Sequence, residues 1–135
     1  MKKKERFNDW KHPKIEESKL TKYNWIVQNI EGLELGYKTD IGAFSYINAK
    51  YGVFIGDYVQ VGSHCSIYSI STIDNKSGRV ILNKNCKVGS HTTILPSVNI
   101  GENSIIGANS LVSVDIPENV IAAGSPAKII KKIYE

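Results

Sequence analysis

Aliphatic residues recur along this chain at a spacing of six. Between Leu35 and Val112 thirteen such positions follow one another, and glycine comes directly after seven of them. Every step is six residues except two: Ile47 to Ile55 is eight, and Ile73 to Leu82 is nine. Neither an α-helix, with about 3.6 residues per turn, nor a strand alternation of two produces this period. A hexapeptide repeat is typical of a parallel β-helix, in which each strand pairs with the coils above and below.

Three hexapeptides per coil would place the aliphatic residues on three inner ladders, one for each face of a prism. The predicted ladders are Leu35, Ile55, Ile73, Ile94 and Val112; Ile41, Val61, Leu82 and Ile100; and Ile47, Ile67, Val88 and Ile106. Glycine and polar positions between them are expected to form the corners. The sequence therefore predicts an all-β fold with one narrow, continuous aliphatic core.

The two irregular steps predict loops that leave the prism. Tyr51 and Gly52 add two residues before Ile55. The larger insertion lies within residues 73–81, where Asn, Lys, Ser and Gly favour a turn. Binding and catalytic residues often lie on loops held by a rigid scaffold, so the larger insertion is a candidate functional region.

The two ends of the chain lack the repeat. We divide the chain into an N-terminal segment, residues 1–34, that packs on the first coil, and a β-helix domain, residues 35–135. Within the segment, residues 14–22 are expected to form a short helical turn and residues 25–30 a strand. After a proline turn at residues 115–119, residues 120–130 are expected to complete one further coil and cap it, because terminal repeats cannot leave a core open.

Composition narrows the class of protein. A chain of 135 residues supports one domain. No apolar run approaches the ~20 residues of a membrane span. The basic start lacks the apolar core of a signal peptide, so we expect a cytoplasmic protein. The net charge of +4 favours anionic partners weakly, and without a nucleic-acid-binding motif we expect no nucleic acid partner.

The two cysteines, Cys65 and Cys86, occupy fifth positions of hexapeptides that lie three units apart. With three units per coil, the two cysteines would lie on adjacent coils, whose strands are about 4.8 Å apart, and this separation is within the Cα–Cα range of a disulfide. A cytosolic protein keeps its thiols reduced, and neighbouring units have Ser, Thr or Val at this position. We therefore interpret both as small core residues.

Residues 53–133 resemble the hexapeptide-repeat acyltransferases, particularly the small acetyltransferases that modify sugars. The resemblance is carried by three elements in order: Ile94-Leu95-Pro96-Ser97-Val98-Asn99-Ile100-Gly101, then Asp115-Ile116-Pro117-Glu118-Asn119, then Ala123-Gly124-Ser125-Pro126-Ala127-Lys128. It implies a left-handed β-helix, an exception to the usual right-handed crossover. It also implies a homotrimer, closed as a ring, with active sites between neighbouring subunits.

The same resemblance implies acetyl-coenzyme A as the acyl donor, bound along the prism edge near the last coils. The matching positions in this chain are Gly107, Ala108, Ala123, Gly124, Pro126, Lys128 and Lys131. Small residues let a thin pantetheine arm approach the backbone, and lysines can neutralise phosphates. The alternative is that these residues are only repeat corners and a solvated tail.

A sugar hydroxyl needs a general base, usually histidine, before it can attack a thioester, whereas a sugar amine needs less help. The chain has three histidines, and His12 lies outside the repeat. His64 and His91 each follow Val-Gly-Ser at a hexapeptide corner, four units apart, so we do not expect them to stack within a subunit. We predict His64 as the catalytic base, because it precedes the polar stretch beside the loop, and His91 as the alternative.

The candidate substrate-binding residues in that polar stretch are Ser71, Thr72, Asp74 and Asn75. In galactoside- and maltose-type acetyltransferases a catalytic histidine follows an Ile-Tyr-x-x-x stretch, and Thr72 stands at that place in this chain. Either His64 or His91 replaces the missing histidine, or the acceptor is an amine. We favour the amino group of a nucleotide-linked amino sugar, as used in surface-polysaccharide biosynthesis, over sugar O-acetylation.

Two other functions are compatible with the predicted fold. Hexapeptide carbonic anhydrases hold zinc by three histidines at a subunit interface, and here Asp or Cys would have to join His64 and His91. We therefore predict no metal site. A non-catalytic scaffold would not bind coenzyme A, and the Ser-Pro-Ala-Lys tail argues against it.

Overall fold

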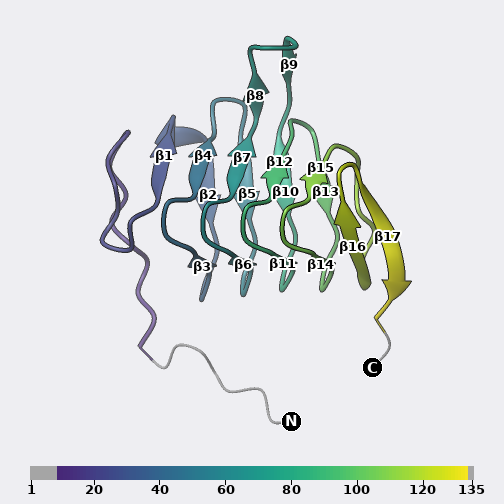
Figure 1. The fold of residues 1–135 in the computed structure, drawn as a ribbon. Coiled ribbons are helices and arrows are strands. Elements are labelled where there is room, and N and C mark those ends of the chain that lie inside the picture. The colour runs from purple at the N-terminus through teal and green to yellow at the C-terminus, as the bar shows by residue number, and fades with distance from the viewer. Residues whose placement is uncertain (1–8, 134–135) are drawn as a thin grey trace.

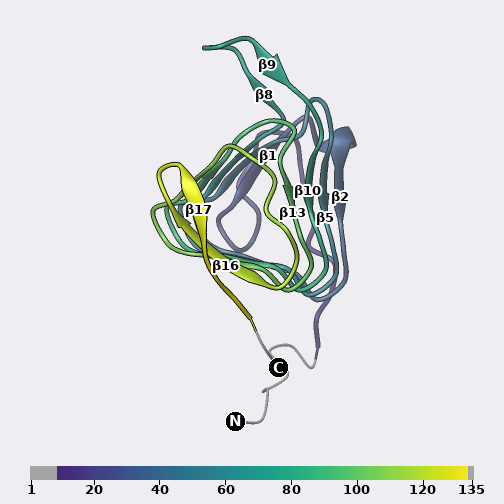
Figure 2. The ribbon, with the colours of Figure 1, turned by 90° about the vertical axis from the view of Figure 1, so that its right-hand side faces the viewer.

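The computed structural model describes residues 9–133 and forms a left-handed parallel β-helix with a triangular cross-section (Figure 1 and Figure 2). Its three faces are sheets whose strands are parallel except the last strand of one face, and we name them A, B and C in the order in which each coil visits them. Each strand pairs with strands one coil away, as the six-residue period predicted. The predicted fold class is confirmed.

The faces contain short strands in regular succession. Face A contains β1 (Ile26–Gln28), β4 (Tyr46–Asn48), β7 (Ser66–Tyr68), β12 (Thr93–Ile94) and β15 (Leu111–Val112). Face B contains β2 (Leu33–Leu35), β5 (Val53–Ile55), β10 (Val80–Leu82) and β13 (Asn99–Ile100). Face C contains β3 (Asp40–Ile41), β6 (Gln60–Val61), β11 (Lys87–Val88), β14 (Ile105–Ile106), β16 (Val120–Gly124) and β17 (Ala127–Lys132). A 3-10 helix, η1 (Ile30–Gly32), joins β1 to β2.

The corners depend on residues with left-handed backbone conformation. Tyr58 and Asn85 occupy one such corner, between faces B and C, with φ of 62° and 61°. Asparagine tolerates this conformation better than most residues because its short polar side chain bonds locally. In the upper coils of this corner Asn85 donates to Asn103 at 2.8 Å, and Asn103 donates to Asn119 at 3.0 Å. This amide ladder links three coils along one edge.

The inner ladders differ from the prediction above the larger loop. They are Val27, Ile47, Ile67, Ile94 and Val112 on face A; Leu35, Ile55, Leu82, Ile100 and Ile116 on face B; and Ile41, Val61, Val88, Ile106 and Ala122 on face C. The predicted pairing of Val88 with Ile67 is wrong, since Val88 pairs with Val61. Ile73 is not in the core, because its side chain is 99% exposed.

A hairpin explains this shift. Strands β8 (Ile70–Ser71) and β9 (Lys76–Ser77) pair antiparallel and project from the corner between faces A and B (Figure 2). The hairpin removes the hexapeptide of Ile73 from the prism, so every later unit moves back by one face. The predicted loop is confirmed, although its strands begin before Ile73.

The N-terminal segment extends the β-helix. The predicted strand over residues 25–30 is confirmed as β1, which pairs with β4, and Trp25 covers the first coil with only 2% of its surface exposed. The predicted helical turn over residues 14–22 is wrong, since this stretch forms turns without a helix. Glu17 instead accepts backbone N–H bonds from Ile30 and Asn29, both at 2.9 Å, and these bonds lower the pKa of Glu17.

The carboxy-terminal end completes a coil and caps it, as predicted. Strand β16 pairs in parallel with β14, and β17 folds back antiparallel on β16. The division of the chain at residue 35 stays a prediction, and residues 1–8 of the predicted N-terminal segment and residues 134–135 of the predicted domain lie outside the described residues.

The two cysteines do not stack on each other. Cys65 precedes β7 on face A, and its N–H donates to Ser45 Oγ in the coil below at 3.2 Å. Cys86 precedes β11 on face C, so the two thiols occupy different corners. The prediction of adjacent sulfur atoms is wrong because it counted Ile73 as a coil unit. Both cysteines are free and fully buried, so their interpretation as core residues is confirmed.

Neither thiol of the native protein is expected to react with a chromogenic disulfide reagent at pH 8. Burial raises the pKa of Cys86 to about 12 and also raises the pKa of Cys65. The reactive thiolate would therefore form only well above the pH of the assay. In denaturant both thiols should react at once. Rapid reaction of one thiol in the folded protein would contradict this placement.

Candidate active site

One corner of the prism, between faces C and A, carries both repeat histidines. We call it the histidine corner, and it consists of residues 22–25, 42–45, 62–65, 89–92 and 107–110 with the turn at residues 124–126. The imidazole rings of His64 and His91 stack with centroids 4.8 Å apart and an interplanar angle of 4°. The prediction that they do not stack is wrong, because the hairpin removes one unit and brings β12 directly above β7.

The backbone of the histidine corner keeps these side chains in line. His64 and His91 both have left-handed conformation, with φ of 57° and 58°. The N–H of His64 donates to Ala43 O, and the N–H of His91 donates to Ser63 O, both at 3.0 Å. Because each corner residue is tied to the coil below, the side chains stack along the edge. Both imidazoles are exposed, and within residues 9–133 neither ring has a hydrogen-bond partner.

Phe44 is a member of this corner that the sequence did not single out. Its ring lies one coil below His64, with centroids 5.4 Å apart and an angle of 43° between the planes. Phe44 is 58% exposed, so its ring is open to solvent beside His64. The available signal was its place in the hexapeptide, since Phe44 and His64 occupy the same corner position in successive coils.

The predicted cofactor-binding residues lie at the carboxy-terminal end of the same corner, except Lys131, which pairs with Ile121 at the far end of β16 from this corner. Gly107 and Ala108 are one coil above the Gly89–Ser90 corner, and a Cβ on Gly89 would lie only 2.5 Å from Ala108 N. Above them, the N–H of Gly124 donates to Ser110 Oγ at 3.1 Å. Ala123 lies in β16, and Pro126 lies in the β16–β17 turn. Lys128 and Lys131 are exposed on β17.

The histidines therefore share one edge with all of the predicted cofactor residues except Lys131. Figure 2 shows the β16–β17 turn at this edge, away from the β8–β9 hairpin. Ala108 and Gly124 are exposed and carry little or no side chain, so a thin ligand can approach their backbone. Lys128 and Lys131 add positive charge that suits phosphates. The residues present fit coenzyme A.

The predicted substrate-binding residues lie elsewhere in the chain. Ser71 and Asp74 belong to the β8–β9 hairpin, as do Thr72 and Asn75 in its turn, so within one subunit face A separates them from the histidine corner. Hydrogen bonding from Ser71 and the nearby Lys76 ammonium, 3.6 Å from Asp74 Oδ2, lower the pKa of Asp74. The hairpin thus presents an ionised carboxylate.

The described part of the chain offers little to other classes of site. In residues 9–133 no three His, Cys, Asp or Glu side chains are grouped so that they could hold a metal ion. Among those same residues, no helix has the length and hydropathy to cross a membrane. The histidine corner itself offers two exposed imidazoles, which can transfer protons, beside a backbone edge of small residues.

Comparisons with known proteins find relatives in sequence and in fold. The family model described as bacterial transferase hexapeptide (six repeats) matches residues 79–113. Galactoside O-acetyltransferase of Escherichia coli (strain K12) is 38% identical over 94 residues, which are 63% of this chain and 46% of that protein. The chain spans between 29% and 46% of the length of the first curated relatives it matches.

Two solved structures with bound ligands are similar in fold and sequence. A galactoside acetyltransferase in complex with coenzyme A has a TM-score of 0.75 at 30% identity, over 82% of this chain and 60% of that one. A variant of AntD, an N-acyltransferase from Bacillus cereus, in complex with dTDP-4-amino-4,6-dideoxyglucose and coenzyme A, has a TM-score of 0.59 at 26% identity, over 83% of this chain and 72% of that one. With its repeat, its coil architecture and these relatives, the chain is similar in sequence and fold to the hexapeptide-repeat acyltransferases.

Proposed function

We propose that this protein is an acetyltransferase that moves an acetyl group from acetyl-coenzyme A to the amino group of a nucleotide-linked amino sugar. The observation that carries the proposal is the shared edge, where His91 lies two coils and His64 three coils below the β16–β17 turn. The bound ligands of the two solved relatives, coenzyme A in both and an amino sugar nucleotide in one, support it.

The proposed donor site uses the small residues at the upper end of the histidine corner and the lysines of β17, a strand that runs from this corner back across face C. Gly107, Ala108, Ala123, Gly124 and Pro126 would border the pantetheine arm, and Lys128 and Lys131 would meet the phosphates. When bound, acetyl-coenzyme A supplies a thioester whose carbon–sulfur bond breaks as the bond to the acceptor forms.

The proposed catalytic step is proton transfer by His64, with His91 as the alternative base. An imidazole nitrogen of His64 accepts the proton that the acceptor nitrogen loses as it attacks the carbonyl carbon, and the same nitrogen then returns the proton to the leaving sulfur. The stacked ring of His91 restricts the orientation of His64. Because the two rings are exposed and adjacent, the acceptor can reach them from solvent.

We further propose that three copies close into a ring with the active sites between neighbours. A heterologous contact that closes would repeat one site three times. Within a single chain the hairpin and the histidine corner lie at different corners, so Ser71, Thr72, Asp74 and Asn75 would bind the acceptor at the histidine corner of a neighbouring subunit. In this arrangement each subunit contributes to two sites.

Sugar O-acetylation is the second candidate, favoured by the similarity to galactoside O-acetyltransferase. A hydroxyl acceptor depends more strongly on a base than an amine does. The hairpin carries Thr72 where the galactoside-type resemblance places a histidine, so His64 or His91 would have to supply that base. The two candidates thus differ in the acceptor atom rather than in the donor.

The proposal predicts acetyl transfer to an amino sugar nucleotide and not to its hydroxyl counterpart. Purified protein would be given acetyl-coenzyme A with matched pairs of nucleotide sugars that differ only in an amino or hydroxyl group at one ring position. Release of free coenzyme A and the mass of the acetylated product would be measured. Transfer confined to the hydroxyl compounds would establish the second candidate, and no transfer to any sugar would contradict both.

A further inference from the structure

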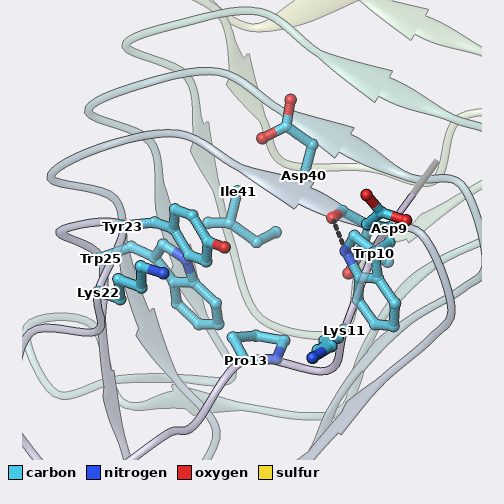
Figure 3. A pocket seen from close by; sticks show the side chains of 10 residues that line it. Asp9, Trp10, Lys11, Pro13, Lys22, Tyr23, Trp25, Asp40 and Ile41 are labelled. Atoms are coloured by element: carbon cyan, nitrogen blue, oxygen red, sulfur yellow. Dashed lines mark hydrogen bonds between the residues drawn. The ribbon is translucent and has the colours of Figure 1, made fainter. Parts of the chain in front are cut away.

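A pocket at the amino-terminal end of the prism has no role in the catalytic proposal. It lies beside β3, between residues 9–13 and the first turn of the histidine corner, and its volume is about 280 Å³. Figure 3 shows Tyr23 and Lys22 on one side of this pocket and Trp10 on the other. Its position in the corner and the chemistry of its lining both indicate a ligand.

Aromatic rings form much of the pocket wall. Tyr23 is 56% exposed, so its ring is available to a ligand. Trp10 is held in place by its indole N–H, which donates to Thr39 O at 2.9 Å. Trp25 is almost completely buried and closes the inner side. A wall of this kind suits a flat aromatic ligand such as a nucleobase, which stacks on aromatic side chains.

The charged residues of the pocket offer two kinds of polar contact to a ligand. Lys11 and Lys22 offer ammonium groups, and Lys22 Nζ lies 5.9 Å from the centroid of the Tyr23 ring. Ammonium groups bind phosphates as point charges. Asp9 and Asp40 also line the pocket, and a carboxylate oxygen can accept an N–H of a nucleobase. A ligand with both a base and phosphates would use both kinds.

The pocket is aligned with the histidines along one edge. Asn24, Phe44 and His64 occupy the same corner position in successive coils, with φ of 66°, 63° and 57°. The N–H of Phe44 donates to Asn24 O, which ties the first of these coils to the second. With coils about 4.8 Å apart, Tyr23 and Lys22 lie roughly 10 Å below His64. A diphosphate bridge can connect a ligand at these two places.

We propose that this pocket binds the nucleobase of a nucleoside diphosphate sugar, whose diphosphate passes Phe44 and whose amino sugar reaches His64. Tyr23 stacks on the base and Lys22 contacts the diphosphate. This inference rests on the proposed function and deepens it, since it assigns the nucleotide part of the acceptor to residues that the catalytic proposal does not use. It also gives the exposed ring of Phe44 a place beside the bound acceptor.

Nucleotide binding can be measured without any acyl donor. The full chain would be titrated with UDP, dTDP and GDP, and with pyrophosphate as a probe that lacks a base. Both tryptophans of the chain line the pocket, so a bound base should quench their fluorescence, and calorimetry would give the affinity. We expect at least one nucleoside diphosphate to bind and quench, and pyrophosphate to bind at least about tenfold more weakly, because it has no base to stack.

Matched variants test the contacts. Tyr23→Ala is expected to weaken nucleotide binding about tenfold, and Lys22→Ala to weaken it less. Lys84 and Tyr58 provide the control pair, because Lys84 Nζ lies 6.0 Å from the centroid of the Tyr58 ring and Tyr58 is 44% exposed, but this pair lies at the corner between faces B and C, away from both the histidine corner and the hairpin. Tyr58→Asn and Lys84→Ala should leave the affinity unchanged. Thermal unfolding would verify that all four variants fold.

The outcomes separate this inference from the proposed function. If the protein acetylates an amino sugar nucleotide but Tyr23→Ala leaves its KM unchanged, the pocket assignment is overturned while the function stands. If a nucleoside diphosphate binds in a Tyr23-dependent way but no acetyl transfer occurs, the pocket assignment stands while the function fails. Equal binding of pyrophosphate and nucleotides, or no binding of either, also overturns the assignment.

Discussion

Replacing Ile67 with alanine is expected to lower the free energy of unfolding by about 2–5 kcal/mol, because the change leaves a cavity in a core that cannot fully collapse. Ile67 is 1% exposed on β7, between Ile47 of the coil below and Ile94 of the coil above. Ile73→Ala is the matched control, and its effect should stay within about 0.5 kcal/mol, since an exposed side chain loses little packing.

Denaturant unfolding of the two variants gives the comparison directly, provided that the slope of the free energy of unfolding against denaturant concentration is the same in both. The measurement is repeated at several protein concentrations. If the hairpin tip contacts another subunit, the effect of Ile73→Ala on the free energy of unfolding will vary with protein concentration. If both variants lose the same free energy of unfolding at every protein concentration, Ile73 belongs to an inner ladder of the core. That result would contradict the order of the inner ladders in every coil above the hairpin.

Replacing His64 with asparagine is expected to lower kcat/KM for acetyl transfer by about 10²–10⁴-fold, the usual contribution of a general base. Asparagine is chosen because Asn24 and Asn109 already occupy this corner position with left-handed conformation, so the backbone should accept it. His91→Asn should cause a smaller loss, since it leaves His64 able to accept a proton. The loss in the double variant should not be the sum of the two, because the rings are in contact.

The control for these variants is Tyr58→Asn. Tyr58 has φ of 62° at a corner between faces B and C, so the same residue enters the same backbone conformation away from the histidines. Its rate of acetyl transfer should match that of the unaltered protein. An unchanged rate in both single histidine variants would rule out the histidine mechanism, whereas a larger loss in His91→Asn would exchange the two assigned roles.

The candidate site could be predicted from the sequence only in part. His64, His91 and the predicted cofactor residues were each singled out by position or resemblance, and all of them except Lys131 lie on one edge of the structure. Their relation to each other was predicted incorrectly, because the histidines were counted as four units apart when one of those units lies in the hairpin. Phe44 and the pocket beside Tyr23 were not identified at all, since nothing in the repeat distinguishes an exposed aromatic corner from a covered one.

The sequence by itself determined the coil period, the inward aliphatic positions, the place of the large insertion and the capping of the carboxy-terminal end. These properties are local, because each follows from residues within one or two hexapeptides. Only the tertiary structure decided which coil lies above which, since that depends on pairing between strands about twenty residues or more apart. Ile73 satisfies the local period and yet has no strand to pair with, and that one unit decides whether the two histidines lie apart or stacked.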